Sequence, residues 1–308
     1  MTQYLAGWDG GGTKTICEIE PLGGGQPRRL RSGPLNLNGA TAGSAERTAA
    51  ELLAQMAQVM RPAGGLAGCR MLCIGAAGIS NPETERKLRA VLAEAGYAGP
   101  VVFTGDQQTA LYGALGGSGG AVLIAGTGSI CYGRTADGRE ARTGGWGSLM
   151  DDEGGGYAIG RDILAAAVRS FDGRTPKSVL EEAVLERLGV RDIGGLIQKI
   201  YAPDTGKKQI AALAPLLSPA LAQKDAAALA ICQKAARELA LLTTPVITAL
   251  GLQSACLALA GSILCKEQNV RAAAVGAIHD KFPVLACVAP QSDAAHGAVL
   301  IAREAAGM

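Results

Sequence analysis

The chain is 308 residues long, 48% of its residues are hydrophobic, 18% are charged, and its formal net charge is +2. Because single hydrophobic cores stop growing at roughly 250 residues, this length predicts two domains. The high apolar content excludes a largely disordered chain, and the scattered Lys and Arg residues argue against nucleic acid or an anionic membrane surface as a partner.

The sequence contains no run of roughly 18 to 20 apolar residues, and it does not begin with a basic segment followed by an apolar one. We therefore expect a cytoplasmic protein with no membrane contact. The eight cysteines lie mostly within apolar runs, which predicts buried thiols. With two histidines and no Cys-x-x-Cys pair, a structural zinc site is not expected.

The predicted elements begin with two strands, at residues 3–9 and 14–20, joined by a glycine-rich turn. Apolar and β-favouring residues flank a segment in which only glycine can bend so tightly. A P-loop and a Rossmann turn both lead from a strand into a helix, and neither spacing is present. The pattern predicts a strand-turn-strand motif, for which an ordinary hairpin is the alternative.

This glycine-rich turn carries groups that suit a chain of phosphates. The backbone N–H groups of Gly11 and Gly12 can approach phosphate oxygens without obstruction by a Cβ atom, and Thr13 adds a hydroxyl. Asp9 could hold Mg²⁺ directly or through water, since hard cations prefer carboxylate oxygen. Lys14 could add positive charge, or it could be a solvated surface side chain.

Strands and helices alternate after this hairpin. A helical period starts at Ser44, which is placed to cap it, and a strand follows at residues 70–75. The next helix starts at Asn81-Pro82, and a short strand follows at residues 101–104. This order predicts a mixed sheet flanked by helices.

Asp106 lies between the strand at residues 101–104 and a helix predicted at residues 107–115. Open α/β sheets bind ligands at the C-terminal ends of their strands, so Asp106 is a candidate functional carboxylate. The alternative is that Asp106 caps the helix, because Asp is favoured at the N-cap.

The second half of the chain repeats this plan. Residues 121–132 again form a strand, a turn at Gly126–Gly128 and a strand, so a duplicated domain is the economical inference. A long helical region is predicted next, at residues 156–250. Two strands follow at residues 255–260 and 284–288, and a closing helix starts at Ser292 or Asp293.

A glycine-rich run at residues 143–156 contains Trp146 and three carboxylates. The apolar face of a pyranose packs on an aromatic ring while its hydroxyls seek carboxylates and backbone groups. Trp146 and Asp152 therefore suit a sugar site. The alternative for Trp146 is a core anchor beneath the loop.

Six motifs occur in order along nearly the whole chain. They are Asp9–Thr13, Gly105-Asp106, Ala125–Ser129, Gly144–Gly147 with Asp152–Gly154, Ala260–Ser262 and Pro290–Asp293. In this order they resemble the N-acetylglucosamine kinase and BadF/BadG/BcrA/BcrD ATPase family, within the sugar kinase, heat-shock protein 70 and actin superfamily.

The resemblance implies an α/β fold of two duplicated ribonuclease H-like domains. Each would be a mixed five-stranded sheet flanked by helices, and the two would enclose an interdomain cleft. We expect an N-terminal ATPase and sugar-binding domain at residues 1–116, with the helix at about 292–308 packing back on it. A C-terminal nucleotide-binding domain would occupy residues 117–291.

The resemblance also implies that the chain uses ATP and Mg²⁺. The nucleotide-binding residues would be Gly11, Gly12, Thr13, Lys14, Gly126, Thr127, Gly128, Gly261 and Ser262, with Asp9 holding the metal. Thr127 would be the counterpart of Thr13 in the second domain. Gly261 and Ser262 match a segment in which a glycine lets the adenosine lie against the backbone.

For the sugar, the resemblance implies binding by Asn36, Asp106, Gly145, Trp146 and Asp152. Asp106 falls where the family keeps its catalytic aspartate, which orients the acceptor hydroxyl and takes its proton as the bond to phosphorus forms. A simple turn role is the alternative for Asn36, as it is for the neighbouring Asn38.

The leading interpretation is an ATP-dependent kinase that phosphorylates the 6-hydroxyl of N-acetylglucosamine or glucosamine while the domains close and exclude water. One alternative is an ATPase that activates an iron–sulfur acyl-CoA reductase or dehydratase, which would need grouped, exposed cysteines. Another is a non-catalytic sugar sensor. Family habit suggests a homodimer with its interface at residues 210–252, for which an ordered core is the alternative.

Overall fold

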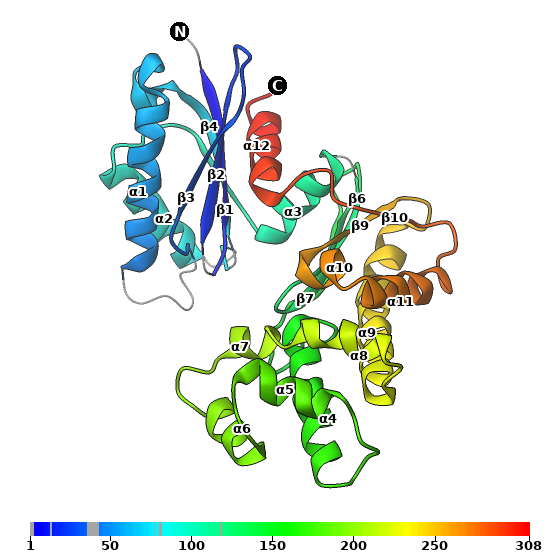
Figure 1. Cartoon of the computed structure of the whole chain (residues 1–308). Coiled ribbons are helices and arrows are strands. Elements are labelled where there is room, and N and C mark those ends of the chain that lie inside the picture. The colour runs from blue at the N-terminus through cyan, green and yellow to red at the C-terminus, as the bar shows by residue number, and fades with distance from the viewer. Residues whose placement is uncertain (1–2, 13, 36–42, 77, 80–81, 118) are drawn as a thin grey trace. The chain divides into compact units, whose positions relative to one another are not determined.

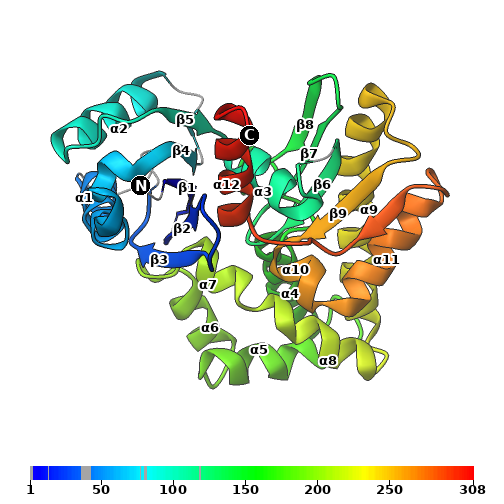
Figure 2. The same cartoon turned by 90° about the horizontal axis from the view of Figure 1, so that it is seen from above.

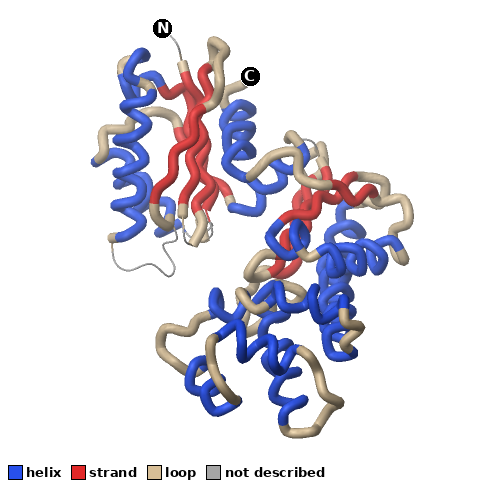
Figure 3. The backbone as a smooth tube through the Cα atoms, in the orientation of Figure 1, coloured by secondary structure: helices blue, strands red, loops and turns tan. Residues whose placement is uncertain are grey.

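The computed structural model of the chain describes residues 3–12, 14–35, 43–76, 78–79, 82–117 and 119–308. It contains two compact units, which we call unit 1 (Met1–Ser118 with Pro290–Met308) and unit 2 (Gly119–Ala289). In each unit the strands gather into one sheet with helices outside it (Figure 3).

The elements of unit 1 are β1 (Tyr4–Gly10), β2 (Thr15–Pro21), β3 (Arg28–Ser32), α1 (Ser44–Val59), the 3₁₀ turns η1 (Arg61–Ala63) and η2 (Gly65–Gly68), β4 (Cys69–Ala76), α2 (Pro82–Glu94), β5 (Val101–Thr104), α3 (Asp106–Leu115) and α12 (Ala294–Ala305). Those of unit 2 are β6 (Gly120–Ala125), β7 (Ser129–Arg134), β8 (Glu140–Gly144), α4 (Gly156–Phe171), α5 (Leu180–Leu188), α6 (Ile193–Ile200), α7 (Lys207–Ala211), η3 (Ala214–Leu216), α8 (Leu217–Ala222), α9 (Ala226–Leu250), β9 (Cys256–Ala260), α10 (Gly261–Lys266), α11 (Gln268–His279) and β10 (Ala286–Val288).

The sheet of unit 1 has the strand order β3-β2-β1-β4-β5. The chain makes an antiparallel hairpin from β1 and β2, adds β3, and then places β4 and β5 parallel to β1. Helices α1 and α2 cover one face, and α3 and α12 cover the other (Figures 1 and 2). Because both faces are covered, the central strands β1 and β4 are apolar along nearly their whole length.

The larger core of unit 1 lies between the sheet and the helices α1 and α2, and a smaller one lies between the sheet and α3 and α12. Trp8 from β1 is fully buried, and its indole Nε1 donates to the Met56 Sδ atom of α1 at 3.3 Å. Leu52 and Leu53 bury the same face of α1, which explains the helical period seen in the sequence. The predicted cap of this helix is wrong, however. Gly43 occupies the N-cap position, and Ser44 is the first helical residue.

Three glycines let α12 pack closely against β1 and α3. A Cβ atom on Gly7 would lie 2.4 Å from the Val299 nitrogen, and one on Gly113 would lie 2.0 Å from the Asp293 carbonyl oxygen. A Cβ atom on Gly297 would lie 1.9 Å from the carbonyl oxygen of Thr109. Real Cβ atoms do not approach backbone this closely, so glycine is required where these elements meet.

The sheet of unit 2 has the order β10-β9-β6-β7-β8 and repeats the pairing pattern of unit 1. An antiparallel group of β6, β7 and β8 is extended by the parallel strands β9 and β10. The predicted fold class, two duplicated mixed five-stranded sheets flanked by helices, is thereby confirmed. The predicted turn at Gly261-Ser262 is wrong in detail, because these residues begin α10.

Helix α9 runs along β6, β7 and β8 and supplies twelve buried residues to the core of unit 2. The ordered-core alternative therefore accounts for much of the stretch at residues 210–252, and the homodimer stays a prediction. Among the described residues, none of the helices combines the length and the apolarity that crossing a bilayer would require.

We expect Gly297→Ala to destabilise the protein by about 3 kcal/mol or more, because the new methyl group would collide with backbone that cannot move without separating α12 from α3. Gly276→Ala in α11 is the matched control, since its Cβ atom would meet nothing within 4 Å. That change should stabilise by up to about 1 kcal/mol. Scanning calorimetry measures both; equal melting temperatures for the two variants would contradict the close-packing account.

Candidate functional site

The first glycine-rich turn joins β1 to β2, as predicted, so the motif is a strand-turn-strand. The Gly11 nitrogen donates to the Lys14 carbonyl oxygen at 3.1 Å, and the Gly11 carbonyl accepts from the Leu35 nitrogen at 3.2 Å. The turn is thus tied to the segment that follows β3. Thr13 and Asn36, two of the predicted ligand-binding residues, lie outside the described residues.

At this end of the sheet the negative charges of Asp106 and Asp293 act on Asp9, and Asp293 was not among the predicted site residues. Asp9 is the second-to-last residue of β1, next to the turn. Asp106 is the first residue of α3, and Asp293 is the N-cap residue of α12. Burial raises the pKa of Asp9 to about 6, the negative charges of Asp106 and Asp293 add to the effect, and Lys14 opposes it. A buried carboxyl group surrounded by like charge is a feature of functional sites.

Asp106 is the first residue of α3, and Gly105 occupies the N-cap position. The N-cap residue of α3 is thus not Asp106 as the alternative had it, and the catalytic role of Asp106 stays a prediction. Its Oδ1 atom accepts a hydrogen bond from the Gln107 nitrogen at 3.1 Å, and its carbonyl accepts one from the Thr109 hydroxyl at 2.9 Å. These contacts fix the backbone of Asp106 at the end of the short strand β5.

The carboxylate of Asp9 accepts no hydrogen bond from the described residues, and hard cations prefer such oxygens. Across the part of the chain that the structure describes, no group of three or more His, Cys, Asp or Glu side chains could hold a metal ion. Mg²⁺ typically keeps several waters and shares phosphate oxygens with its nucleotide, so one carboxylate such as Asp9 fits this mode of binding.

Sequence reasoning missed a charged network that holds Asp293. Arg29 donates to Asp293 at 2.6 Å and to Glu18 at 2.9 Å, and the His296 ring Nδ1 lies 2.6 Å from the Glu18 carboxylate. Burial by itself would raise the pKa of Asp293, but the hydrogen bond from Arg29 lowers it below its ordinary value. The available signal was the cross-strand pair Glu18 and Arg29, which face each other in β2 and β3.

We predict that Asp9→Asn stabilises the protein at pH 8 and leaves its stability unchanged near pH 3.5. Because the folded-state pKa of about 6 exceeds the ordinary value of about 3.9, ionised Asp9 destabilises the folded state. That penalty is absent below pH 4, grows between pH 4 and 6, and is constant above. It should reach roughly 2–3 kcal/mol.

Thermal melting of wild type and Asp9→Asn across this pH range, without Mg²⁺ or nucleotide, measures the effect. Glu83→Gln on the exposed face of α2 is the control, since its carboxylate has a lowered pKa and should show the opposite trend. An Asp9→Asn variant less stable than wild type at pH 8 would contradict the burial of a destabilising charge.

The second glycine-rich turn, between β6 and β7, is built into the loop that precedes α4. The Gly156 nitrogen donates to the Gly126 carbonyl at 2.8 Å, and the Tyr157 nitrogen donates to the Thr127 carbonyl at 2.9 Å. The Gly126 nitrogen also donates to the Gly128 carbonyl at 2.9 Å, which closes the turn. Two motifs that were separate in the sequence therefore form one structure.

Asp152 lies against this second turn. A Cβ atom on Gly128 would come within 2.5 Å of the Asp152 carboxyl carbon, so the carboxylate occupies the space that a side chain would need. Asp152 is 93% buried and has a positive φ of 66°, a conformation that non-glycine residues rarely adopt. Such strain is characteristic of functional positions.

Glu153 anchors the same loop to the helices behind it. Its carbonyl accepts from the Ser129 hydroxyl at 2.6 Å, and its carboxylate pairs with Arg161 of α4 at 2.7 Å and with Lys234 of α9 at 3.2 Å. Burial alone would raise the pKa of Glu153, but the hydrogen bonds from the two cations lower it below its ordinary value. Contacts with β7, α4 and α9 therefore hold the loop that carries Asp152.

Trp146 is 60% exposed, so the alternative of a core anchor is wrong. Its ring lies under the Arg142 guanidinium, with 4.4 Å between the Arg142 Cζ atom and the ring centroid. Gly145 precedes it with a φ of 71°, and Leu149 and Met150, which follow in the same loop, are also exposed. An exposed aromatic residue in a glycine-rich loop suits ligand contact.

Gly261 begins α10 with a φ of 87°, and a Cβ atom there would lie 2.3 Å from the Ala125 carbonyl oxygen. Glycine is thus required where α10 meets the end of β6, one residue before the second turn. Ser262 follows as an exposed residue of α10. The structure places Gly261 against Ala125, the residue before Gly126, and the contact of Gly261 and Ser262 with adenosine stays a prediction.

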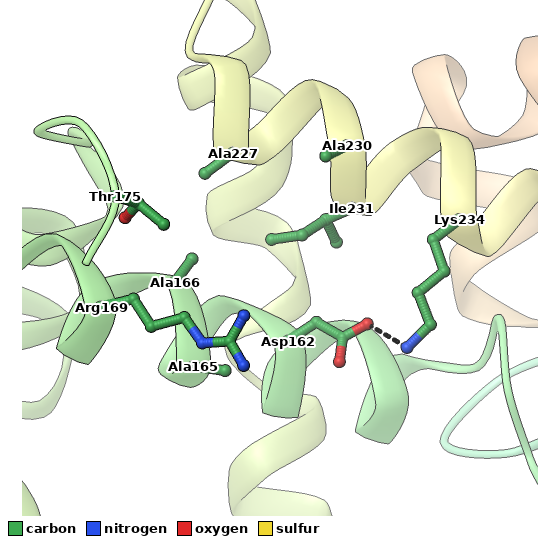
Figure 4. Close-up of a pocket in the computed structure, with 9 residues that line it drawn as sticks. All are labelled: Asp162, Ala165, Ala166, Arg169, Thr175, Ala227, Ala230, Ile231 and Lys234. Atoms are coloured by element: carbon green, nitrogen blue, oxygen red, sulfur yellow. Dashed lines mark hydrogen bonds and ion pairs between the residues drawn. The ribbon is translucent and has the colours of Figure 1, made fainter.

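A hollow of about 440 Å³ lies between α4 and α9 (Figure 4). Figure 4 shows Arg169 and Thr175 at one end, and the ion pair of Asp162 and Lys234, 2.8 Å long, at the other. The hollow is not filled because four of the residues that line it have small side chains: Ala165, Ala166, Ala227 and Ala230. The lining contains none of the predicted site residues, and its link to the site is the contact of Lys234 with Glu153.

Two of the solved structures that resemble this chain are a sugar kinase and a protein proposed to be one. One is a ROK family glucokinase from Streptomyces griseus in complex with glucose and AMPPNP, with a TM-score of 0.57, 17% identity and 98% coverage of both chains. A protein from Chromobacterium violaceum proposed to be an N-acetylglucosamine kinase has a TM-score of 0.76 and 28% identity, and covers 97% of this chain and 98% of its own. The fold is that of the two-domain, actin-like sugar kinases.

Residues 6–302 match the BadF/BadG/BcrA/BcrD ATPase family, and the chain belongs to this family. It is 34% identical over 303 residues to an N-acetylmuramic acid/N-acetylglucosamine kinase of Clostridium acetobutylicum, with 98% of each chain covered. It is also 39% identical over 134 residues to an N-acetyl-D-glucosamine kinase of Dictyostelium discoideum, covering 43% of this chain and 42% of that one. The predicted resemblance is confirmed, and these relatives are enzymes of the predicted class.

We expect Gly155→Ala to weaken ATP binding about 10- to 100-fold, because its Cβ atom would lie 2.7 Å from the Gly128 carbonyl carbon and displace the second turn. Titration calorimetry with a non-hydrolysable ATP analogue measures the change. Gly206→Ala is the control, since its Cβ atom would have an ordinary 3.5 Å contact. Equal affinities in the two variants would show that the turn does not depend on this contact.

Proposed function

We propose that the chain is an ATP-dependent hexosamine kinase that phosphorylates the 6-hydroxyl of N-acetylglucosamine, with Asp106 as the general base. One observation carries the proposal: Asp106 is fixed at the end of β5, near Asp9, whose pKa is raised mainly by burial and further by the charge of Asp106. Kinase chemistry needs such a pair, one carboxylate on the metal side and one on the acceptor side.

In the proposed reaction, the acceptor hydroxyl donates a hydrogen bond to the Asp106 carboxylate. Its oxygen attacks the γ-phosphorus of ATP, the bond from that phosphorus to the bridging oxygen breaks, and the proton passes to Asp106 as ADP leaves. Bound Mg²⁺ would neutralise charge on the β- and γ-phosphate oxygens, and Asp9 is the residue suited to hold it. The phosphate-binding residues would be Gly11, Gly12, Thr13, Lys14, Gly126, Thr127 and Gly128.

For the acceptor, the proposal assigns the exposed indole of Trp146 to the apolar face of the pyranose and the Asp152 carboxylate to a hydroxyl or amide. Support comes from the exposure of Trp146 and from the buried, strained conformation of Asp152. Asn36 and Gly145 complete the proposed set. The Clostridium relative acts on both N-acetylmuramic acid and N-acetylglucosamine, so both sugars belong in the assay.

The iron–sulfur alternative is not favoured. It needs grouped cysteines, and among the described residues no three cysteine, histidine or acidic side chains form a metal-binding group. The prediction of buried thiols is only partly right, since Cys256 and Cys265 are exposed while Cys17, Cys73 and Cys131 are buried. Burial raises the pKa of Cys73 to about 12, so that thiol is a poor metal ligand.

We predict that N-acetylglucosamine stimulates ADP release by the wild-type enzyme, and that Asp106→Asn lowers kcat about 10²- to 10⁴-fold while changing the KM for ATP little. The isosteric amide keeps the hydrogen bond but cannot take a proton. A coupled ADP assay across N-acetylglucosamine, glucosamine, N-acetylmuramic acid and glucose makes the measurement. Asp204→Asn, an exposed residue in unit 2, is the matched control.

Two results would contradict the proposal in different ways. If no sugar of the panel stimulates ADP release, the chain is not a hexosamine kinase. If sugar-stimulated turnover persists at full rate in Asp106→Asn, the kinase activity stands and Asp106 is not its base.

A further inference from the structure

We propose that Arg142 is a positioning residue for the acceptor sugar, because it fixes the indole of Trp146 in the orientation that the sugar meets. The inference rests on the proposed sugar kinase function. It goes beyond the predicted site residues, which do not include Arg142, and it explains how a loop rich in glycine can present an aromatic ring in a defined place.

One side chain makes three contacts with the start of this loop. The Arg142 Cζ atom lies 4.4 Å from the centroid of the Trp146 ring. Its Nε atom donates to the Gly144 carbonyl at 3.1 Å, and its Nη2 atom donates to the Gly145 carbonyl at 2.8 Å. The guanidinium thus binds the two peptide groups that precede Trp146 while it covers the ring itself.

The backbone around Trp146 needs such support. Gly144, Gly145 and Gly147 have φ values of 80°, 71° and 94°, so three of the four residues from 144 to 147 are glycines in left-handed conformations. Glycine has more backbone freedom than any other residue, so these three glycines do not by themselves fix the conformation of the loop. Without added contacts, the orientation of the Trp146 ring would be weakly determined.

Asp151 supports the loop from its other end. Its Oδ2 atom accepts from the Trp146 nitrogen at 3.4 Å, and its own nitrogen donates to the Gly147 carbonyl at 2.8 Å. Trp146 is therefore held through its ring by Arg142 and through its backbone by Asp151. One face of the indole is covered by the guanidinium, while Trp146 as a whole is still 60% exposed. The opposite face is the one left for a ligand.

Arg142 differs from the neighbouring arginines of the sequence, which form ion pairs with carboxylates. Arg139, on the same β-hairpin, pairs with Asp137 at 3.0 Å, and Arg134 lies 3.6 Å from Glu140. Arg142 forms no ion pair with any carboxylate of the described residues. The planar guanidinium of Arg142 can donate to the two carbonyl groups while it lies over the ring. A lysine ammonium on a flexible side chain cannot make these contacts together.

Tryptophan fluorescence offers a test that does not depend on activity. The sequence contains two tryptophans, and Trp8 is fully buried, so acrylamide quenches chiefly Trp146. We expect Arg142→Lys and Arg142→Met to increase the quenching constant, because the ring loses the guanidinium that covers one face. Arg139→Lys, an exposed arginine of the same hairpin, should leave the constant unchanged.

Steady-state kinetics then test the link to the acceptor. Both Arg142 variants should raise the KM for the sugar about 5- to 10-fold, with kcat and the KM for ATP changed less than about twofold. This split distinguishes loss of sugar positioning from loss of chemistry or of fold. Circular dichroism of the variants serves as the check on folding.

The outcomes separate the two claims. Quenching constants of the Arg142 variants equal to that of Arg139→Lys would overturn the positioning role, whether or not the enzyme phosphorylates sugars. Increased quenching with an unchanged KM for the sugar would overturn the link between this ring and the acceptor. A wild type with no sugar-dependent turnover removes the proposed function and the acceptor link together, while the quenching result still decides whether Arg142 orients Trp146.

Discussion

The structure depends on backbone approaching backbone more closely than any Cβ atom would allow. In unit 2, Gly155 and Gly128 meet so that the loop carrying Asp152 lies directly on the second glycine-rich turn. That contact fixes a carboxylate, a turn of backbone amides and the start of α4 relative to one another.

Unit 1 uses the same constraint for a different purpose. Glycines at the contacts of α12 with β1 and α3 let these elements pack closely, and the three elements carry the carboxylates Asp9, Asp106 and, at the N-cap of α12, Asp293. Burial raises the pKa of Asp9, and the charges of Asp106 and Asp293 raise it further, so ionised Asp9 carries an electrostatic cost. In the proposed function, Mg²⁺ held by Asp9 would relieve that cost on binding.

Much of the fold was predictable from local sequence. The periodicity of apolar residues and the two Gly/Thr turns predicted the duplicated sheets. These signals depend on residues that are close together in the chain. The contact of the Asp152 carboxylate with Gly128 was not predictable, since it joins residues 24 positions apart in the chain. The Arg29 network was missed because the partner of Glu18 and Arg29 is Asp293 in α12. The exposure of Trp146 followed from neither its type nor its glycine neighbours.

The central claim is that the acidic end of the first sheet supports phosphoryl transfer to an amino sugar. Phosphorus NMR of the protein with ATP, Mg²⁺ and N-acetylglucosamine tests this most directly, because it observes donor and product together. We expect ATP to disappear as ADP and a sugar 6-phosphate monoester appear in equal amounts. Formation of ADP with inorganic phosphate, and without a sugar phosphate, would contradict it.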